Sequence, residues 1–448
     1  GNTAVGTNAL EANVAANNTA VGLNALVANT TGADNVAIGA DSLDANSTGS
    51  ENTAIGRNAL GANTTAGGNT AIGRNALLVN TTGAANIAIG ESALDANTTA
   101  SNNLAIGNAA LGANTTGTAN VAVGKSAGLA ITTGENNTAI GYQTLKSATT
   151  THGNTALGEN ALRDCTGTEN TAIGSSAMFD GTGGSENVAV GNDTLIVNAG
   201  DENVAVGGDS LKANTTGSEN IGIGYESLKA NTTASENVAV GMQALTTVTT
   251  SGNNTAVGRM ALKLNTAAGN TAVGHQTMLN NSTGTANTAV GKNALDSNTT
   301  ADNNTAVGYD ALQANSTGAS LTAVGKDALA ANTTGDNNIG MGRDAGQSIT
   351  TGSNNIAIGV EALESVTGTN MNVAIGKGAG AACTGAENVF VGHEAGNDNT
   401  TAEYNTFIGN KAGTKNTTGT QNVALGAMAL DANTTTNACT AIGYDSLT

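Results

Sequence analysis

The sequence predicts an all-β parallel solenoid, in which the backbone completes one coil about every 17 residues and each coil lies on the previous one. A unit of the form Asn-(Thr/Val/Ile)-Ala-(Val/Ile)-Gly recurs 27 times in 448 residues, with 21 of the 26 steps 17 residues long and five 16 residues long. The chain also has no Pro, which would delete a backbone hydrogen bond wherever it stood in a strand. We therefore expect one continuous β-solenoid over residues 1–448, without a linker or a second domain.

The elements within each coil follow from the spacing of its apolar residues. Val36 and Ile38 are two residues apart, which is the period of a strand, and β-branched side chains suit a pleated surface. Leu43 and Ala45 have the same spacing, so we expect a second strand, with about four or five residues in each. Asn-Thr-Thr-Gly clusters supply the turns between the strands, and the density of Gly, Asn and Thr excludes helices.

Stacked coils align identical residues into ladders along the solenoid axis. Ala with Val or Ile, and Leu, are expected to form a thin continuous core, and Asn at the corners to bond the turn backbone and one another. The 16-residue steps are expected to lose one residue at a corner and leave the strands intact. At ~4.8 Å per coil, 27 coils would span roughly 130 Å.

One strand face consists of Ala and Gly in almost every coil. We interpret this stripe as a surface for close packing between neighbouring chains of a homo-oligomer; the alternative is that it lines the interior of a single-chain coil. Phe390 and Phe407 replace the Ala in adjacent coils and are expected to thicken the interface. Both ends of the chain stop inside coils, and open strand edges favour further repeats or end-to-end stacking.

Composition excludes several classes of protein. Collagen needs Pro and a Gly at every third position, whereas this chain has 62 Gly and no Pro. With 11% charged and 39% hydrophobic residues it does not resemble a charge-swollen disordered chain. No apolar run is long enough to span a membrane, and a net charge of −19 disfavours nucleic acid as a partner. The chain begins with Gly1 and shows no signal peptide, so we expect an excerpt or a processed form.

The units Asn35-Val36-Ala37-Ile38-Gly39 and Gly124-Lys125-Ser126-Ala127-Gly128 resemble the head repeats of trimeric autotransporter adhesins. The longer form, Asn-Thr-Ala-Ile-Gly-x-x-Ala-Leu, resembles arrays in bacterial tail-fibre-like surface proteins. The resemblance implies parallel β-rolls, usually with three chains side by side, on extracellular adhesive or structural fibres. The sequence departs from the adhesin pattern in its longer period and has no coiled-coil stalk, membrane anchor or tail-fibre chaperone domain. The Ala-Gly variant of the second unit recurs at Gly346, Gly380, Gly396 and Gly413.

Acidic residues recur just before the corner Asn. Stacked carboxylates can hold Ca²⁺, but the repeat of calcium-binding β-rolls is absent, and a solvated acidic edge that maintains solubility is the favoured interpretation. Arg57 and Arg74 share a register with Glu91 and are explained by an exposed charge ladder. The acidic residues are Glu51, Glu169, Glu186, Glu202, Glu219, Glu236 and Glu387.

Histidines and cysteines are few. His275 and His393 share a register seven coils apart, and His152 lies elsewhere, so they cannot ligate one metal within a chain. Cys165 and Cys383 both replace a corner Asn, thirteen coils apart, and cannot form a disulfide within one solenoid. Corner substitution explains them, and the alternative is that each Cys meets its own copy across symmetric chains. We therefore expect no catalytic, metal or cofactor residues.

Asn-x-Thr/Ser recurs at one corner and matches the acceptor pattern for N-glycosylation. Turn formation by Asn and Thr is the favoured explanation, and a ribbon of sugars is the alternative. The pattern occurs at Asn29, Asn46, Asn63, Asn80, Asn97, Asn114, Asn214, Asn231, Asn298, Asn315, Asn332 and Asn433, among others.

These patterns favour a non-enzymatic, extracellular or cell-surface fibre segment that acts as a stiff rod or shaft of an adhesin or tail fibre. Its expected partners are copies of itself, as a homo-oligomer or trimer or stacked end to end, and a surface carbohydrate or host receptor. The alternative is a binding module whose Thr face binds ice, a polysaccharide or a host-surface ligand, since 14 coils carry Thr at the first strand position. A polysaccharide lyase or hydrolase would need a local cluster of acids and bases, which the nearly interchangeable coils do not offer.

Overall fold

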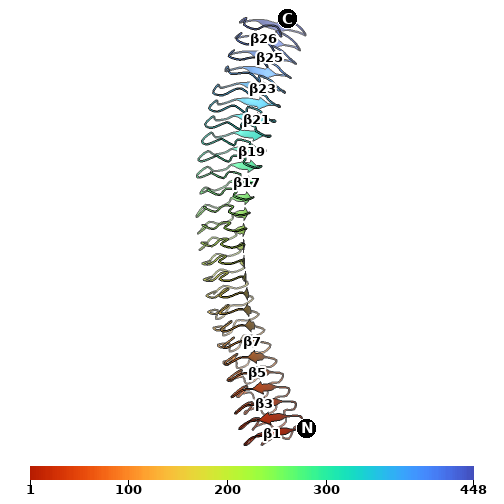
Figure 1. The fold of residues 1–448 in the computed structure, drawn as a ribbon, viewed down its shortest axis with the longest axis vertical. Coiled ribbons are helices and arrows are strands. Elements are labelled where there is room, and N and C mark those ends of the chain that lie inside the picture. The colour runs from red at the N-terminus through yellow and green to blue at the C-terminus, as the bar shows by residue number, and fades with distance from the viewer. Residues whose placement is uncertain (448) are drawn as a thin grey trace. The chain divides into compact units, whose positions relative to one another are not determined.

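A computed structural model describes residues 1–447. The chain divides into two compact units, Gly1–Asn220 and Ile221–Thr448. Each unit is a parallel β-solenoid whose coils succeed one another in chain order (Figure 1). Residues 1–447 contain 27 strands and no helix, so the predicted fold class is confirmed.

Every strand contains three residues, and each coil contributes one strand. The unit Gly1–Asn220 contains β1 (Thr3–Val5), β2 (Thr19–Val21), β3 (Val36–Ile38), β4 (Thr53–Ile55), β5 (Thr70–Ile72), β6 (Ile87–Ile89), β7 (Leu104–Ile106), β8 (Val121–Val123), β9 (Thr138–Ile140), β10 (Thr155–Leu157), β11 (Thr171–Ile173), β12 (Val188–Val190) and β13 (Val204–Val206). The unit Ile221–Thr448 contains β14 (Ile221–Ile223), β15 (Val238–Val240), β16 (Thr255–Val257), β17 (Thr271–Val273), β18 (Thr288–Val290), β19 (Thr305–Val307), β20 (Thr322–Val324), β21 (Ile339–Met341), β22 (Ile356–Ile358), β23 (Val373–Ile375), β24 (Val389–Val391), β25 (Thr406–Ile408), β26 (Val423–Leu425) and β27 (Thr440–Ile442).

Strands pair in parallel with identical register positions opposite each other. Val36 lies opposite Thr53 across a 17-residue step, and Thr155 lies opposite Thr171 across a 16-residue step. The shorter steps therefore leave the strand register intact, as predicted. Backbone hydrogen bonds also join coils outside the strands, as from Leu60 N to Ala76 O at 3.0 Å.

The predicted second strand is wrong, because the Ala-Leu segment is a turn. Within it two residues per coil have positive φ, for example Asn58 at 57° and Leu60 at 52°. Leu rarely adopts this left-handed conformation, which costs about 1–2 kcal/mol. The Gly before the turn is also required: Gly56 has φ 135°, and a Cβ there would lie 2.5 Å from the carbonyl oxygen of Gly73 in the next coil. Alternate apolar spacing thus reflects a tight turn whose Leu points inward.

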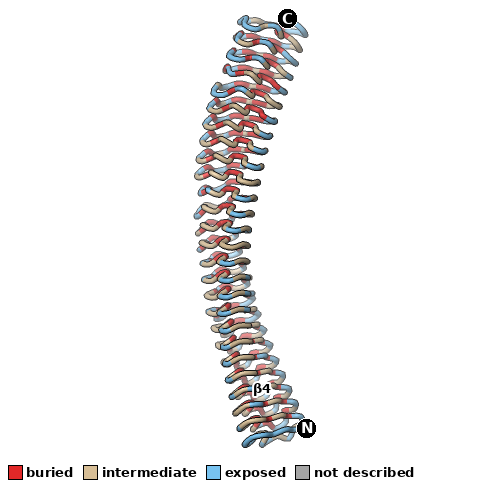
Figure 2. Tube along the Cα trace, viewed as in Figure 1, coloured by how far each residue is buried: buried red, intermediate tan, exposed pale blue. Residues whose placement is uncertain are grey.

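The core of each unit consists of Ala from the middle of the strand together with the Ala and Leu of the turn. Ala54, Ala59 and Leu60 of one coil all have an exposed fraction of 0%. The buried residues form an inner band along the coils (Figure 2). Val and Ile at the third strand position face outward instead, as Ile55 does with 36% exposed. The expectation that these residues join the core is therefore wrong.

The Ala stripe also lies inside the coil and is not a packing surface between chains. Phe390 and Phe407, expected to thicken an interface, are completely buried, with ring centroids 5.8 Å apart. They fit because the neighbouring turns carry Gly380, Gly396 and Gly413 where most coils have Leu. Each ring fills space that a Leu side chain occupies elsewhere.

Two Asn ladders join the coils at their corners, as predicted. Asn69, just before β5, donates from Nδ2 to Gly83 O at 2.9 Å and accepts from the backbone N of Asn86 at 2.9 Å. At the other corner, Asn63 donates to Asn46 Oδ1 of the preceding coil at 2.8 Å and to Ala66 O at 3.0 Å. Asn63 bonds its own turn and the preceding coil, and Asn69 bonds the following coil twice, so these buried amides satisfy turn backbone that a thin core cannot cover.

Candidate interaction face

The outward side of the strands presents two files of side chains, which we call the strand face. The first strand position carries Thr in 14 coils and Val, Ile or Leu in the others, and the third carries Val, Ile, Leu or Met. Both positions are partly or fully exposed throughout, as with Ile38 at 39% and Val290 at 38%. The strand face is therefore a repetitive surface that combines hydroxyl and methyl groups.

Thr is most regular on β16–β20, which all read Thr-Ala-Val. Five consecutive coils in this unit therefore align their hydroxyls in one unbroken file. In the unit Gly1–Asn220 the longest such file covers only β9–β11. Thr alternates with Val, Ile or Leu in most other coils, so an extended Thr array is confined to this block.

The acidic residues before the corner Asn lie on exposed turns. Glu51 has φ 62° and Glu186 has φ 59°, and the backbone N of Glu51 donates to Ala33 O at 3.0 Å. No group of three His, Cys, Asp or Glu side chains in residues 1–447 is arranged to hold a metal ion. The structure gives no support to the calcium interpretation, and the carboxylates lie along a solvated edge.

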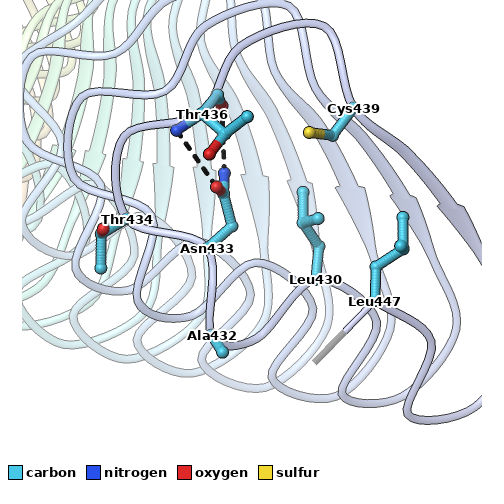
Figure 3. A pocket seen from close by; sticks show the side chains of 7 residues that line it. All are labelled: Leu430, Ala432, Asn433, Thr434, Thr436, Cys439 and Leu447. Carbon is cyan, nitrogen blue, oxygen red and sulfur yellow. Dashed lines mark hydrogen bonds between the residues drawn. The ribbon is translucent and has the colours of Figure 1, made fainter.

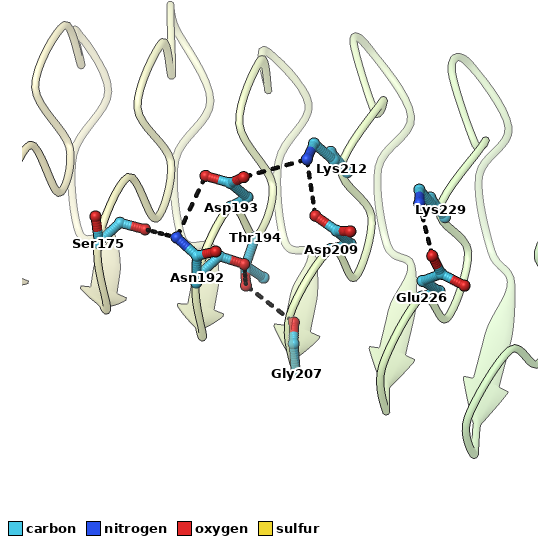
Figure 4. Close-up of polar contacts among 9 residues, drawn as sticks. All are labelled: Ser175, Asn192, Asp193, Thr194, Gly207, Asp209, Lys212, Glu226 and Lys229. Carbon is cyan, nitrogen blue, oxygen red and sulfur yellow. Dashed lines mark hydrogen bonds and ion pairs between the residues drawn. The ribbon is translucent and has the colours of Figure 1, made fainter.

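Charged side chains pair along the turns within each unit (Figure 4). In the unit Gly1–Asn220, Lys212 Nζ lies 2.8 Å from Asp209 and 3.2 Å from Asp193. The hydrogen bond to Asp209 is the main cause that raises the pKa of Lys212. In the other unit, Lys229 lies 2.7 Å from Glu226 and lowers the pKa of that carboxyl group. These pairs are solvent-accessible and contribute little to stability.

The expected charge ladder of Arg57, Arg74 and Glu91 is partly formed. Arg74 forms an ion pair with Glu91 one coil away, and both side chains are about half exposed. Arg74 and Glu91 therefore form an exposed charge pair between adjacent coils, as expected.

The histidines and cysteines occupy separate places. His275 Nε2 lies 3.2 Å from Arg259 Nη1, and His393 lies 3.7 Å from Glu394. Cys165 and Cys383 are free and completely buried at their corners. Burial raises the pKa of each of these two thiols to about 11, because it disfavours the thiolate. They are poor nucleophiles and fill corners, as the corner-substitution interpretation expects.

The Asn-x-Thr/Ser corners bury their Asn side chains, except that Asn433 on the last coils is partly exposed. Asn46, Asn63 and Asn114 are completely buried, and Asn46 Nδ2 donates to Asn29 and to Gly49 O. Attaching a glycan to such an amide would break these hydrogen bonds and force the Asn side chain out of the corner. The structure therefore favours the turn interpretation.

Two hollows on the described surface are of sufficient size to consider as sites. One lies on the last coils and is lined by Leu430, Ala432, Asn433, Thr434, Thr436, Cys439 and Leu447 (Figure 3). There Asn433 and Thr436 exchange hydrogen bonds of 3.2 and 3.1 Å, which close the corner. The other hollow lies beside Gly61, between the Asp44 carboxylate and Leu78. Burial raises the pKa of Asp44. Neither hollow brings together an acid, a base and a nucleophile.

No protein-family profile and no curated protein sequence matches this chain. No described helix is long and apolar enough to cross a membrane. Sequence reasoning missed one group of residues, Arg259, His275 and Lys292, which directly follow the repeat Gly beside β16–β18. Their signal was available in the sequence as a recurring position with a locally unusual charge. The candidate functional surface is thus the strand face together with the residues at its edge.

Proposed function

We propose that the array is an extracellular structural segment that acts as a stiff rod or shaft of an adhesin or tail fibre. The observation that supports this proposal is the density of bonding between coils within each unit. Within each unit adjacent coils are joined at the strand and at the Ala-Leu turn, and in most coils also at the Asn corners, for example through Leu60, Asn63 and Asn69. Bending such a stack requires several ladders to lengthen together, so repeated coils resist bending.

A rod holds the parts attached to its two ends at a fixed distance, and this function needs no catalytic residue. Short turns bonded to adjacent coils also leave little extended backbone for a protease. We expect the purified protein to appear as rods of roughly 130 Å in negative-stain micrographs, from ~4.8 Å per coil. Compact particles, or flexible threads, would contradict the proposal. Limited trypsin treatment provides a second measurement, because a stiff array keeps its length after digestion.

Self-association is the proposed partnership, as homo-oligomers or trimers and as stacks joined end to end. The buried Ala stripe cannot mediate packing side by side, so that role passes to the strand face, where apolar groups such as Ile38 and Leu157 are 39% and 45% exposed. Sedimentation equilibrium gives the number of chains. Substitution I38K/I55K, two coils of the strand face, should weaken side-by-side association, and a monomer at all concentrations would overturn this part of the proposal.

The second candidate function is a binding module that uses the Thr file of β16–β20. The observation that favours it is the five-coil block of identical Thr-Ala-Val strands. Regularly spaced hydroxyls beside methyl groups match a flat, ordered surface such as ice or a crystalline polysaccharide. Thermal hysteresis, or retention on chitin or cellulose that T271V/T288V abolishes, supports this function. Absence of both effects removes it.

A further inference from the structure

The chain has 34 Asp and Glu in 448 positions, and its longest segment without an acidic residue is residues 237–295. That segment contains no Asp or Glu, although it holds three of the 15 Lys and Arg and one of the three His. It lies within the unit Ile221–Thr448 and includes β15–β18. In a chain with a net charge of −19, residues 237–295 are thus the longest locally cationic segment; residues 52–90 and 96–134 are shorter acid-free segments that hold Arg57, Arg74 and Lys125.

Two of these cations and the histidine occupy the same register position, directly after the repeat Gly. Arg259, His275 and Lys292 follow β16, β17 and β18, and Tyr309 takes the same position after β19. Successive members lie about one strand spacing apart, ~4.8 Å. Arg259 Nη1 donates to His275 Nε2 at 3.2 Å, and Lys292 Nζ lies 5.4 Å from the centre of the Tyr309 ring. The four side chains form a file along the carboxyl ends of the strands.

The cations in this file differ from those in the following coils. Lys326 lies 2.9 Å from Asp327, and Arg343 lies 2.6 Å from Glu361, so each is neutralised. Among the described residues, neither Arg259 nor Lys292 lies in a salt bridge with an acidic side chain. Both side chains are exposed, and their charges remain available to an external anion.

The strands beside this file carry the regular part of the Thr array. Each of β16–β19 presents a Thr at its first position and a Val at its third, and Val257, Val273 and Val290 are 36–38% exposed. Three files of side chains therefore run in parallel across the same coils. The first consists of Thr hydroxyl groups, the second of Val methyl groups, and the third of Arg259, His275, Lys292 and finally Tyr309. We call this combined surface the cationic face.

We propose that the cationic face binds a linear acidic polysaccharide whose chain runs along the stacked coils. The carboxylate or sulfate groups of such a polymer pair with Arg259 and Lys292, its ring hydroxyls bond the Thr file, and the apolar faces of its sugar rings lie on the Val file and Tyr309. Sugar residues of an extended chain advance by about one strand spacing, so the repeat of the polymer matches the repeat of the coils. Non-covalent contact alone is involved.

Composition favours a polysaccharide over a nucleic acid. Single-stranded nucleic acids bind through several aromatic stacking platforms in a basic groove, whereas Tyr309 is the one aromatic residue in the file from Arg259 to Tyr309. The site does not depend on the rod role, and it differs from an uncharged ice or cellulose surface because it requires cations.

The test measures retention of the full-length protein on immobilised polygalacturonate and heparin, with dextran and single-stranded DNA as comparisons. We expect binding to the acidic polysaccharides at low salt and at least tenfold weaker binding for R259A/H275A/K292A. Counterion release by the two ionic contacts, at Arg259 and Lys292, on a flexible polyanion predicts a log–log salt slope of about −1.4. The double variant R259Q/K292Q keeps the side-chain bulk and provides a second, less disruptive test.

The matched control is R57A/R74A/K125A, which removes three cations from the same register in the unit Gly1–Asn220. It should change affinity less than twofold, and circular dichroism should show that all variants stay folded. The proposal is overturned by absence of binding to both acidic polymers, by equal loss in the control, or by equal retention on dextran or single-stranded DNA. Electron micrographs of the same preparation report the rod separately, so failure of one proposal is distinguishable from failure of the other.

Discussion

The interior placement of Phe390 predicts that its ring and the neighbouring glycines form one packing unit. A Cβ at Gly380 would lie 2.5 Å from Phe390 Cδ2, and a Cβ at Gly396 would also overlap the ring. F390A should therefore leave a cavity that no neighbouring side chain can fill. We expect a loss near the upper end of the range for Phe→Ala, about 4–5 kcal/mol in the local stability of these coils.

Placing a Leu at Gly396 should destabilise the protein when Phe390 is present, and should compensate for the loss of the ring when it is combined with F390A. G396L places a Leu where Gly396 has φ 58°, a conformation that Leu363 adopts at 50° in a nearby coil, so the backbone tolerates it. The clash with Phe390 should cost about 1–3 kcal/mol. F390A/G396L restores the Ala and Leu pair of an ordinary coil and should lose only about 1–2 kcal/mol, a coupling of about 3 kcal/mol or more.

Hydrogen exchange of peptides from residues 373–413 is the assay, because a repeat array unfolds locally and a single global transition does not apply. Peptides from the unit Gly1–Asn220 serve as an internal reference. G346L is the control substitution: its Cβ would meet Leu329 Cδ2 at 2.8 Å and Ile349 Cδ1 at 3.0 Å, both ends of flexible side chains. Additive losses in the double variant would refute the account of the core.

Three further predictions follow from buried polar groups. N69A should cost about 1–3 kcal/mol in local stability, because it leaves the buried backbone N–H of Asn86 unpaired, while Gly83 O keeps its bond from Asn80 Nδ2; unchanged hydrogen exchange around β5 and β6 would contradict this. Burial, and then the nearby Asp310, raise the pKa of Asp296. The carboxylate therefore destabilises the fold above the raised pKa and not below the ordinary value of 3.8, so D296N should raise Tm at pH 7 but not at pH 3. Iodoacetamide should modify Cys439 in the folded protein and Cys165 and Cys383 only after denaturation, as mass spectrometry of each peptide will show.

The period of the sequence predicted the coil, the parallel register and the Asn corners, because each depends on which residues recur at a fixed distance. Asn69 illustrates this: an Asn recurs before 25 of the 27 strands, and its bond to the next coil can be predicted without knowing which way the other side chains point. The 16-residue steps were also predictable, since a parallel ladder such as Thr155 on Thr171 tolerates loss of a residue only at a corner.

The direction of side chains was not predictable from spacing alone. Alternation at Leu43 and Ala45 is compatible with a strand and with a turn in which Leu has positive φ, and the turn is what the structure contains. The exchange of Leu for Gly in five coils was a usable signal, because Gly readily adopts the same φ. Phe390 beside Gly396 carried a similar signal, since a large residue next to a lost Leu indicates a shared interior.

Which face carries function depends on charge over many coils and not on any single motif. Arg259, His275 and Lys292 are unremarkable individually, because every coil has a residue at that position. They indicate a binding surface only because residues 237–295 contain no acidic residue and because the three side chains line up along one edge of the stacked strands. No short pattern in the sequence represents such a surface.

The central claim is that each 17-residue repeat advances the chain by one strand spacing, and distances between spin labels test it most directly. Thr31, Thr99 and Thr133 are exposed and share a register within the unit Gly1–Asn220. In a C439S background, labels at Thr31 and Thr99 should lie about 19 Å apart, and labels at Thr31 and Thr133 about 29 Å apart, both with narrow distributions. Broad distributions centred near ~45 and ~55 Å, as for a flexible chain of the same length, would contradict the account.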